Sequence, residues 1–422
     1  MGQPQTSNLR RLWERWKNVA LTSGADIGLA GLGLVSGILT ARLLAPAGKG
    51  ELTAALLWPG LFQTFANFGM RHAVVYFSGR RSDQIGALAA GITALSLVMG
   101  GIAGLIGVLV IPSIIDDYSP STLLATQVLF AWLPFAILGG NALAILQGQG
   151  RFQPWNILRV FRQVFYVGSI VALWVVDLVH VHYVVYAYLI ADILVTTGAV
   201  SVVARSIERF EFDVGLLKEL LWYGSRNFLA SMAGQANYQL DQAIISALLA
   251  PRLLGLYKVA VSSSQFVKLM SMGFQRVIIS DVARSNSDAE GHEKIRRSLK
   301  TASPFLILSS VLIALAMPLL LPLMFGQEYA PAVPAAQIMC LASAVFGMKQ
   351  ILYNGARGQG RPQIPLYCEF MALAVTAAGL YVLLPMLEIK GAAITSLLAY
   401  SSGLAAAFYF LRRSERAIDA AK

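Results

Sequence analysis

The chain has 422 residues, of which 56% are hydrophobic and only 13% are charged. Soluble globular proteins carry about 25% charged residues, so this composition excludes a disordered chain and argues against a soluble enzyme. The net charge of +11 does not indicate nucleic-acid binding, because the Lys and Arg residues lie in short clusters between long apolar runs.

Apolar runs of membrane-spanning length dominate the chain after a polar, basic segment at residues 1–17 that we expect to be cytoplasmic or interfacial. A transmembrane helix needs about 20 mostly apolar residues. Twelve such runs follow in chain order, and 222–249 and 254–280 carry the most polar residues: 18–43, 53–78, 84–112, 121–146, 155–177, 181–204, 222–249, 254–280, 301–324, 331–355, 364–386 and 390–411. The sequence therefore predicts an all-α integral membrane protein with about 12 transmembrane helices.

The distribution of basic residues predicts the orientation. With the N-terminus inside, the cytoplasmic segments hold 21 of the 33 Lys and Arg residues and the exterior segments hold 4. Cytoplasmic loops of membrane proteins carry this excess of positive charge. We therefore expect both termini to be cytoplasmic, in a multi-pass protein of the inner (cytoplasmic) membrane.

Two tetrapeptides recur along the chain at nearly equal offsets. Leu-Leu-Ala-Pro at 43–46 returns at 248–251, and Gly-Gln-Gly-Arg at 148–151 returns at 358–361. In both copies of the first motif, a glycine follows the proline by four residues. An even number of runs separates the copies, so the halves share one orientation, which is a parallel repeat. The alternative is coincidence in a low-complexity apolar chain.

The repeat predicts two six-helix bundles around a central cleft. The expected parts are an N-lobe at 18–204, a cytoplasmic inter-lobe linker at 205–221, a C-lobe at 222–411 and a cytoplasmic tail at 412–422. Two lobes that rock around a fixed site are typical of a transporter rather than an enzyme.

Motifs for catalysis or for cofactor binding are absent from the sequence. No phosphate-binding loop of the G-x-x-x-x-G-K-[ST] type occurs. The two cysteines, Cys340 and Cys368, lie inside apolar runs and form no metal-ligand or disulfide pattern. We expect no catalytic residues, no metal and no cofactor. The glycines within two runs are expected to permit close helix packing: Gly28, Gly31, Gly33 and Gly37, and Gly100, Gly101, Gly104 and Gly107.

Charged and polar residues inside the runs are the candidate site. A charge at membrane depth costs at least about 2.5–3.5 kcal/mol, so it usually faces a cavity or a polar partner. The residues expected to line a substrate cavity are Arg71, Arg226, Asn237, Asp241, Gln242, Gln265, Lys268 and Arg276. Asp26 and Asp241 are candidates for ion coupling. The alternative for the polar residues of the runs 222–249 and 254–280 is that they form hydrogen bonds between helices.

A second group of charges lies nearer the ends of the runs. For these residues the sequence favours side chains that reach the lipid headgroups instead of a cavity. They are Arg159, Arg162, Lys258, Lys349 and Glu369. The buried candidates are mainly cationic, which favours anionic cargo, since arginine binds phosphate oxygens through its planar fork.

Three segments resemble the polysaccharide transporters of the multidrug/oligosaccharidyl-lipid/polysaccharide exporter superfamily. They are ARLLAPAGKGELTAALLWPGLFQTFANFGMRHAVVYFSGR from Ala41 to Arg80, LQGQGRF from Leu146 to Phe152 and NYQLDQAIISALLAPRLLGLYKVAVS from Asn237 to Ser262. The resemblance implies V-shaped lobes with alternating access, and it places Arg71, Asn237, Asp241 and Gln242 where cavity residues are expected. Lipid II flippases of the superfamily usually have two further helices, so twelve spans weigh against that branch.

The resemblance implies an O-antigen-type flippase that moves polyprenyl-diphosphate-linked oligosaccharide from the inner to the outer leaflet. Its partners would be membrane lipids, a coupling proton or sodium ion, and a polysaccharide polymerase and glycosyltransferases. Three alternatives stay open: a cation-coupled multidrug exporter of the same fold, a membrane glycan polymerase or ligase, and a non-transporting scaffold. The polymerase would need a large exterior loop, which the sequence lacks.

Overall fold

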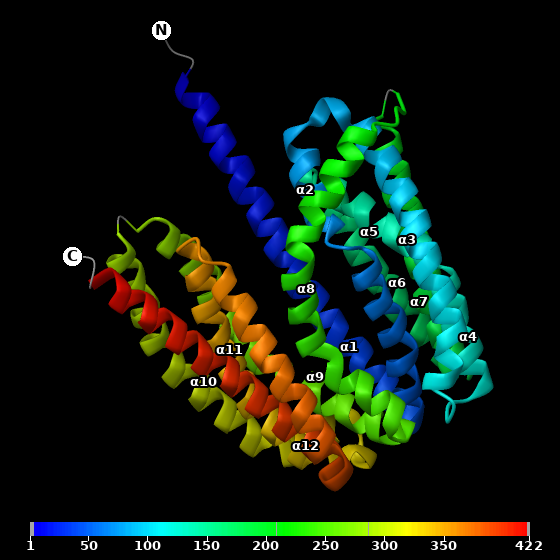
Figure 1. Cartoon of the computed structure of the whole chain (residues 1–422). Helices are drawn as coiled ribbons and strands as arrows, with labels where there is room; N and C mark the ends of the chain where they lie inside the picture. The colour runs from blue at the N-terminus through cyan, green and yellow to red at the C-terminus, as the bar shows by residue number, and fades with distance from the viewer. Residues whose placement is uncertain (1–3, 208, 286, 420–422) are drawn as a thin grey trace. The chain divides into compact units, whose positions relative to one another are not determined.

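The computed structural model describes residues 4–207, 209–285 and 287–419, with the side chains of those ranges apart from 4–20, 82, 226, 227, 229–231, 276, 414 and 416–419. Every regular element in these ranges is a helix (Figure 1). In chain order they are α1 (Pro4–Ala66), α2 (Met70–Arg80), η1 (Ser82–Gln84), α3 (Ile85–Ile114), α4 (Pro120–Ala131), α5 (Leu133–Gly148), α6 (Phe152–Val175), α7 (Val181–Ala204), α8 (Val214–Leu248), α9 (Pro251–Ala283), α10 (Asp288–Phe325), η2 (Gln327–Ala332), α11 (Val333–Gly358) and α12 (Gln363–Asp419).

Single-residue breaks divide the two longest helices. The backbone leaves helical geometry at Ala45 in α1 (φ 57°, ψ 176°) and at Glu388 in α12 (φ 48°, ψ −129°). The kink in α12 falls between the predicted runs 364–386 and 390–411, both of which this helix contains. The kink in α1 follows the run 18–43, whereas the run 53–78 is interrupted after Ala66 and continues in α2. The predicted run 121–146 is also bent, because α4 and α5 meet at 53°.

The apolar helices establish a multi-pass membrane protein. By length and composition, 7 helices of the described chain could cross a membrane, or 8 if α4 and α5 form one span. The helices α8 and α9, which hold the two most polar runs, are not among them. This count takes α1 and α12 once each, so the number of twelve spans stays a prediction.

Leucine side chains form an exposed apolar face on α10. Leu308, Leu312, Leu315 and Leu319 are 60%, 58%, 71% and 72% exposed. Their spacing of three or four residues places them on one face of the helix. An exposed apolar stripe of this length would be unfavourable in water and suits contact with lipid tails.

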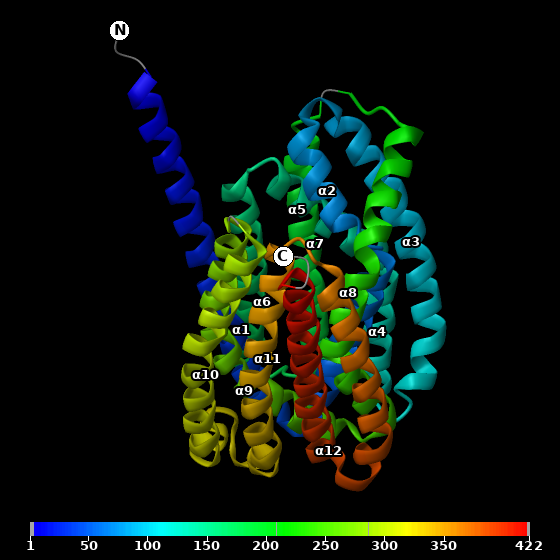
Figure 2. The same ribbon diagram turned by 60° about the vertical axis from the view of Figure 1, so that its left-hand side comes forward.

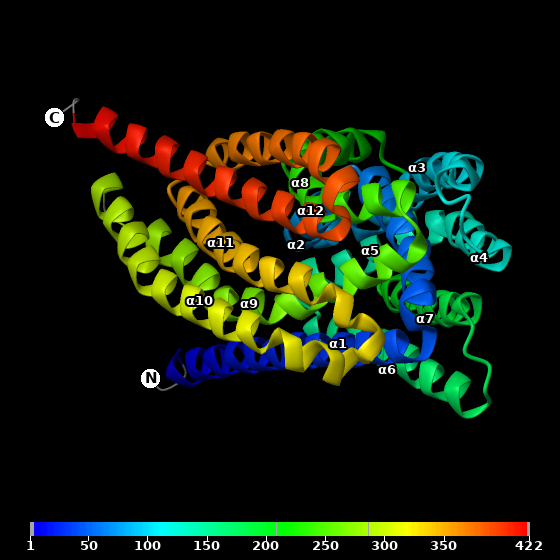
Figure 3. The same cartoon turned by 90° about the horizontal axis from the view of Figure 1, so that it is seen from below.

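The chain forms two compact units, the first comprising Met1–Leu44 and Ala55–Leu229 and the second Ala45–Ala54 and Ala230–Lys422. In the first unit, α5 packs against α2, α3 and α7, and α6 packs against α7. In the second, α11 packs against α9, α10 and α12, as two further views show (Figures 2 and 3). The predicted lobe limits stay a prediction.

The repeated Gly-Gln-Gly-Arg motifs adopt the same structure in the two units. They end α5 and α11, and their second glycine is left-handed in both, with φ 71° at Gly150 and 73° at Gly360. In each copy the arginine amide donates to the carbonyl oxygen five residues earlier at 2.9 Å. This is the Schellman helix end, in which glycine tolerates the positive φ that other residues avoid. The repeat is therefore structural and not a coincidence.

The glycines that follow the repeated prolines contact each other's motif reciprocally within the second unit. A Cβ added to Gly50 would lie 1.7 Å from the Pro251 carbonyl oxygen, and one added to Gly255 would lie 1.9 Å from the Pro46 oxygen. Each helix start therefore packs its proline carbonyl against the other's glycine. This contact explains why glycine stands four residues after proline in both copies.

The predicted glycine packing is confirmed in one run and wrong in the other. On α3, a Cβ added at Gly104 or Gly107 would lie 2.5 or 2.0 Å from Phe130 atoms, and Gly100 packs as closely on Pro134; only Gly101 is open. On α1, no described atom of the same unit lies within 4 Å of an added Cβ at four glycines: Gly28, Gly31, Gly33 and Gly37. At these four positions α1 has no side chain and makes no close contact within its own unit.

Candidate functional site

Arginines of α6 form the polar centre of the first unit. Arg159 pairs with Asp26 of α1 at 2.9 Å, and its guanidinium lies 4.1 Å from the centre of the Trp155 ring. Arg162, one turn later, pairs with Asp192 of α7 at 3.5 Å. Residues three and four apart share one helix face, so α6 presents Trp155, Arg159 and Arg162 together.

Neutral polar side chains join the same two helices along their length. Asn156 donates to the Thr22 hydroxyl at 3.1 Å, and Gln163 donates to the Ser36 hydroxyl at 3.2 Å. With the Arg159–Asp26 pair between them, these bonds form a polar seam from α1 to α6. A seam of this kind is worth more than its single bonds where water is scarce.

Arg71 completes a cluster of three guanidinium groups, which we call the arginine cluster (Arg71, Arg159 and Arg162). Arg71 lies in the first turn of α2, two residues after the left-handed Gly69. Its side chain is exposed and lies within electrostatic range of Arg159 and Arg162. Arg71 forms no ion pair within the described part of the chain, so the cluster has one cation more than it has carboxylate partners.

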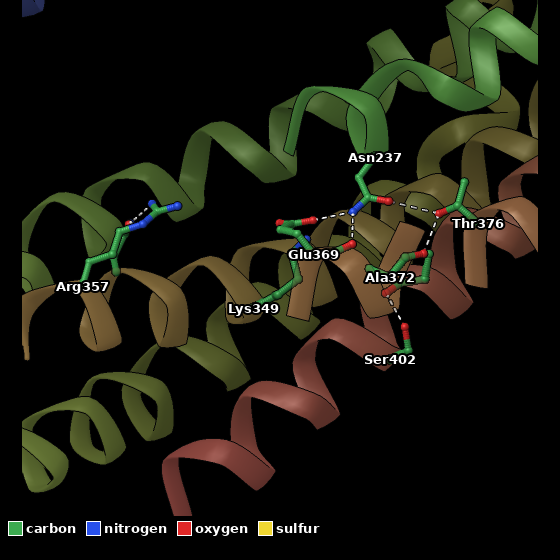
Figure 4. Close-up of polar contacts among 9 residues, drawn as sticks. Asn237, Lys349, Arg357, Glu369, Ala372, Thr376 and Ser402 are labelled. Atoms are coloured by element: carbon green, nitrogen blue, oxygen red, sulfur yellow. Dashed lines mark hydrogen bonds and ion pairs between the residues drawn. The ribbon is translucent and has the colours of Figure 1, made fainter. Parts of the chain in front are cut away.

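The second unit contains a buried ion pair (Figure 4). Lys349 of α11 donates to Glu369 Oε1 of α12 at 2.9 Å, and their side chains are only 1% and 10% exposed. Asn237 of α8 donates to Glu369 Oε2 at 2.5 Å and to its backbone oxygen at 2.8 Å. Thr376 in turn donates to Asn237 Oδ1 at 3.4 Å. Both oxygens of the Glu369 carboxylate are thus satisfied.

Asp241 is the centre of a second buried network, one helical turn after Asn237. Its carboxylate accepts hydrogen bonds from the hydroxyl groups of Tyr257 at 2.5 Å and Ser396 at 3.3 Å, and from the backbone amide of Gln242 at 2.7 Å. The Gln242 side chain accepts from Lys258 at 3.0 Å. The network joins α8, α9 and α12.

Lys268 of α9 lies among aromatic rings. Its ammonium nitrogen lies 4.7 Å from the centre of the Tyr238 ring, 4.8 Å from Phe346 and 5.8 Å from Tyr400. Gln265, on the preceding turn of α9, donates to the Tyr238 hydroxyl at 3.4 Å. Ammonium groups at these distances are attracted to the negative faces of aromatic rings.

The sequence-predicted site residues therefore separate into two groups. Arg71 and Asp26 belong to the first unit, while five belong to the networks of the second: Asn237, Asp241, Gln242, Gln265 and Lys268. The side chains of Arg226 and Arg276 lie outside those that the structure describes. Cavity lining and ion coupling stay predictions for all of these residues.

The prediction that Lys349 and Glu369 reach the lipid headgroups is wrong, because the two side chains neutralise each other inside the unit. The same prediction fails for Lys258, which donates to the buried Gln242. For Arg159 and Arg162, which pair with carboxylates but stay partly exposed, it remains a prediction. Opposite charges on neighbouring runs were the available signal. Depth along a helix does not reveal which way a side chain points.

Comparisons with known proteins assign the chain to a family. The family described as polysaccharide biosynthesis protein matches residues 39–334. No curated protein sequence matches the chain. Among solved structures, the lipid II flippase MurJ in an inward closed conformation has a TM-score of 0.75 at 14% identity, covering 93% of this chain and 87% of MurJ.

Two further structures come from the same superfamily. An inward-facing multidrug resistance MATE transporter of the MOP superfamily has a TM-score of 0.74 at 13% identity, over 92% of this chain and 94% of the transporter. A MOP superfamily transporter from Pyrococcus furiosus has 0.63 at 13% identity, over 95% and 94%. These likenesses show a shared fold, and the family match shows that the chain belongs to the polysaccharide biosynthesis protein family.

Proposed function

We propose that this protein is a flippase that moves polyprenyl-diphosphate-linked oligosaccharide from the inner to the outer leaflet of the cytoplasmic membrane. The membership in a polysaccharide biosynthesis family supports a glycan cargo. The likeness to MurJ, which is described as a lipid II flippase, supports a lipid-linked one. On this proposal the chain is a transporter and catalyses no bond formation.

The arginine cluster is the observation that carries the proposal. A diphosphate cannot cross bare hydrocarbon, because the loss of its hydration is prohibitive without compensating bonds. Arg71 offers an exposed guanidinium that forms no ion pair with any described side chain, within electrostatic range of two further arginines. Guanidinium forks bind phosphate oxygens in pairs of parallel bonds, so this cluster suits a diphosphate headgroup.

The proposed cycle uses the predicted lobes. The lobes at 18–204 and 222–411 would rock about the linker at 205–221, with both termini cytoplasmic, while the polyprenyl tail stays in lipid. The energy would come from a proton or sodium ion through Asp26 or Asp241, or from consumption of the product outside. A polysaccharide polymerase and glycosyltransferases would act after and before this step.

The second candidate is a cation-coupled multidrug exporter, which the likeness to the MATE transporter favours. An exporter of organic cations needs free carboxylates in its site. Here Asp26 is paired with Arg159, and Asp241 already accepts three hydrogen bonds. Drug-resistance assays in an exporter-deficient strain separate the two candidates, because the flippase would confer no resistance.

Transport of lipid-linked oligosaccharide into proteoliposomes tests the proposed function. We expect Arg71→Ala to lower the initial rate by about tenfold or more, since the loss of one charge-assisted bond to phosphate is of this size. Arg71→Lys should retain an intermediate rate. Arg252→Ala removes an exposed arginine at the start of α9 and serves as the matched control. A normal rate for Arg71→Ala would remove the diphosphate-binding role of the cluster.

A further inference from the structure

The ammonium group of Lys268 occupies a cage of aromatic rings that come from three other helices. Tyr238 belongs to α8, Phe346 to α11 and Tyr400 to α12, at 4.7, 4.8 and 5.8 Å from the nitrogen. The Phe346 and Tyr400 ring centres are 5.2 Å apart. Convergence of rings from three helices on one cation is a built arrangement, not a chance contact on one helix face.

A carboxylate supplies the remaining part of a cation site. Asp241 lies within electrostatic range of Lys268, although the two form no ion pair within the described side chains. Aromatic rings together with a nearby carboxylate are the groups with which proteins bind organic ammonium ions. The cage therefore has the chemistry of an organic-cation site, already filled by a side chain of the same chain.

Lys349 shows why Lys268 is the replaceable cation of this region. Lys349 contacts the Phe346 and Tyr400 rings at 5.3 and 5.2 Å, but its charge is matched by Glu369 at 2.9 Å. Removal of Lys349 would leave Glu369 buried and unpaired. Removal of Lys268 would leave only the rings and a carboxylate that is already hydrogen-bonded.

We propose that Lys268 is a tethered occupant of an organic-cation site and that it closes this site to cationic cargo. The inference goes beyond the proposed function: it identifies the residue that sets specificity against quaternary and primary ammonium compounds. A phosphate ligand would need a lysine whose donors are directed away from the protein, whereas the aromatic rings surround this one. Truncation of Lys268 should thus create a vacant cage that binds a free ammonium ion.

Binding of choline to the purified full-length protein in detergent tests the inference. We expect choline to raise the melting temperature of Lys268→Ala saturably by several degrees, because a ligand that binds only the folded state stabilises it. Wild type and Lys268→Arg, whose cages are filled, should show no shift. Lys300→Ala removes an exposed lysine of α10 and should behave as wild type.

A neutral probe separates cation binding from simple filling of a hole. The alcohol in which carbon replaces the nitrogen of choline has the same shape without the charge, and it should give a much smaller shift. Equal shifts from the two probes, or no choline shift in a folded Lys268→Ala protein, would overturn the inference. Removal of the Tyr238 ring in the background of Lys268→Ala should weaken choline binding severalfold.

A second truncation covers the case in which Lys268→Ala does not fold. Lys268→Ser would then be expressed and purified with choline present throughout, and its yield of monodisperse protein compared with that obtained without choline. Recovery with choline is the expected result. Failure of both variants in the presence of choline contradicts the inference, since a free cation should replace the tethered one. These readouts do not depend on transport, so they stand apart from the test of the proposed flippase.

Discussion

The arginine cluster of the first unit and the lysine networks of the second unit use opposite strategies on a repeated scaffold. Arg159 and Arg162 keep 25% and 43% of their side chains exposed, and Arg71 is exposed too. In the second unit, Lys349 is 1% exposed and is held by a carboxylate and aromatic rings. An accessible guanidinium can exchange partners with a cargo, whereas a buried pair mainly fixes its own helices. On the proposed function, the first unit is therefore the half that binds the headgroup.

The largest expected effect is the loss of the buried pair. Lys349→Met should destabilise the protein by about 3–5 kcal/mol, because it leaves the Glu369 carboxylate buried without its cation. Thermal unfolding in detergent, followed by the loss of monodisperse protein, would measure the effect.

The double variant Lys349→Met with Glu369→Gln is the control for that experiment. It removes both charges, keeps an amide for the bonds with Asn237, and should recover most of the lost stability. If the double variant were as unstable as the single one, the pair would owe its importance to packing and not to charge.

A test of the repeat itself should give the next largest effect. Gly50→Ala and Gly255→Ala should each cost about 1–3 kcal/mol, because the added methyl group meets a proline carbonyl oxygen in a packed contact. Gly31→Ala adds the same methyl group where no atom of its unit is near, and alanine favours helix by up to about 1 kcal/mol.

Opposite signs for these substitutions are therefore expected from melting temperatures measured side by side. A harmless Gly255→Ala would mean that the two proline motifs do not meet, and the comparison between the halves would lose its structural basis.

The smallest effect on stability is expected at the Arg159–Asp26 pair. Its side chains are 25% and 35% exposed, so Asp26→Asn should change stability by at most about 1 kcal/mol. Transport should change more than stability, because Arg159 would be released to bind anions in place of Asp26. Parallel measurement of melting temperature and of transport rate would show this separation, and a large stability loss with normal transport would contradict it.

The apolar runs predicted most of the fold because lipid imposes one requirement, length, that sequence displays directly. The runs at 84–112 and 155–177 correspond to α3 and α6. The gaps between runs predicted a break near Ala45 and Glu388, but the sharp kinks themselves were not predictable, because neither residue type marks a positive φ. The recurring tetrapeptides indicated the repeat, because the Gly-Gln-Gly-Arg copies form the same helix end and the glycines after the Leu-Leu-Ala-Pro copies make the same contact.

The site was only half predictable for a related reason. The polar positions Asn237 and Asp241 stand out against an apolar background, and both lie in networks. Their partners, Glu369 and Tyr257, come from other helices. Helix periodicity gives the face of a residue and says nothing about what lies opposite. Lys349 illustrates the limit, since proximity to the end of a run suggested lipid headgroups and the structure provides a carboxylate.

The reciprocal contact at Gly50 and Gly255 has a consequence for how this chain can vary. At each position a carbonyl oxygen of the other motif occupies the space that a side chain would need. Neither glycine can therefore be replaced by a larger residue unless the other motif moves. Related chains should therefore change the two positions together or not at all. Duplicated halves that diverge freely elsewhere would be tied at this one crossing, which makes it a natural marker for aligning distant members of the family.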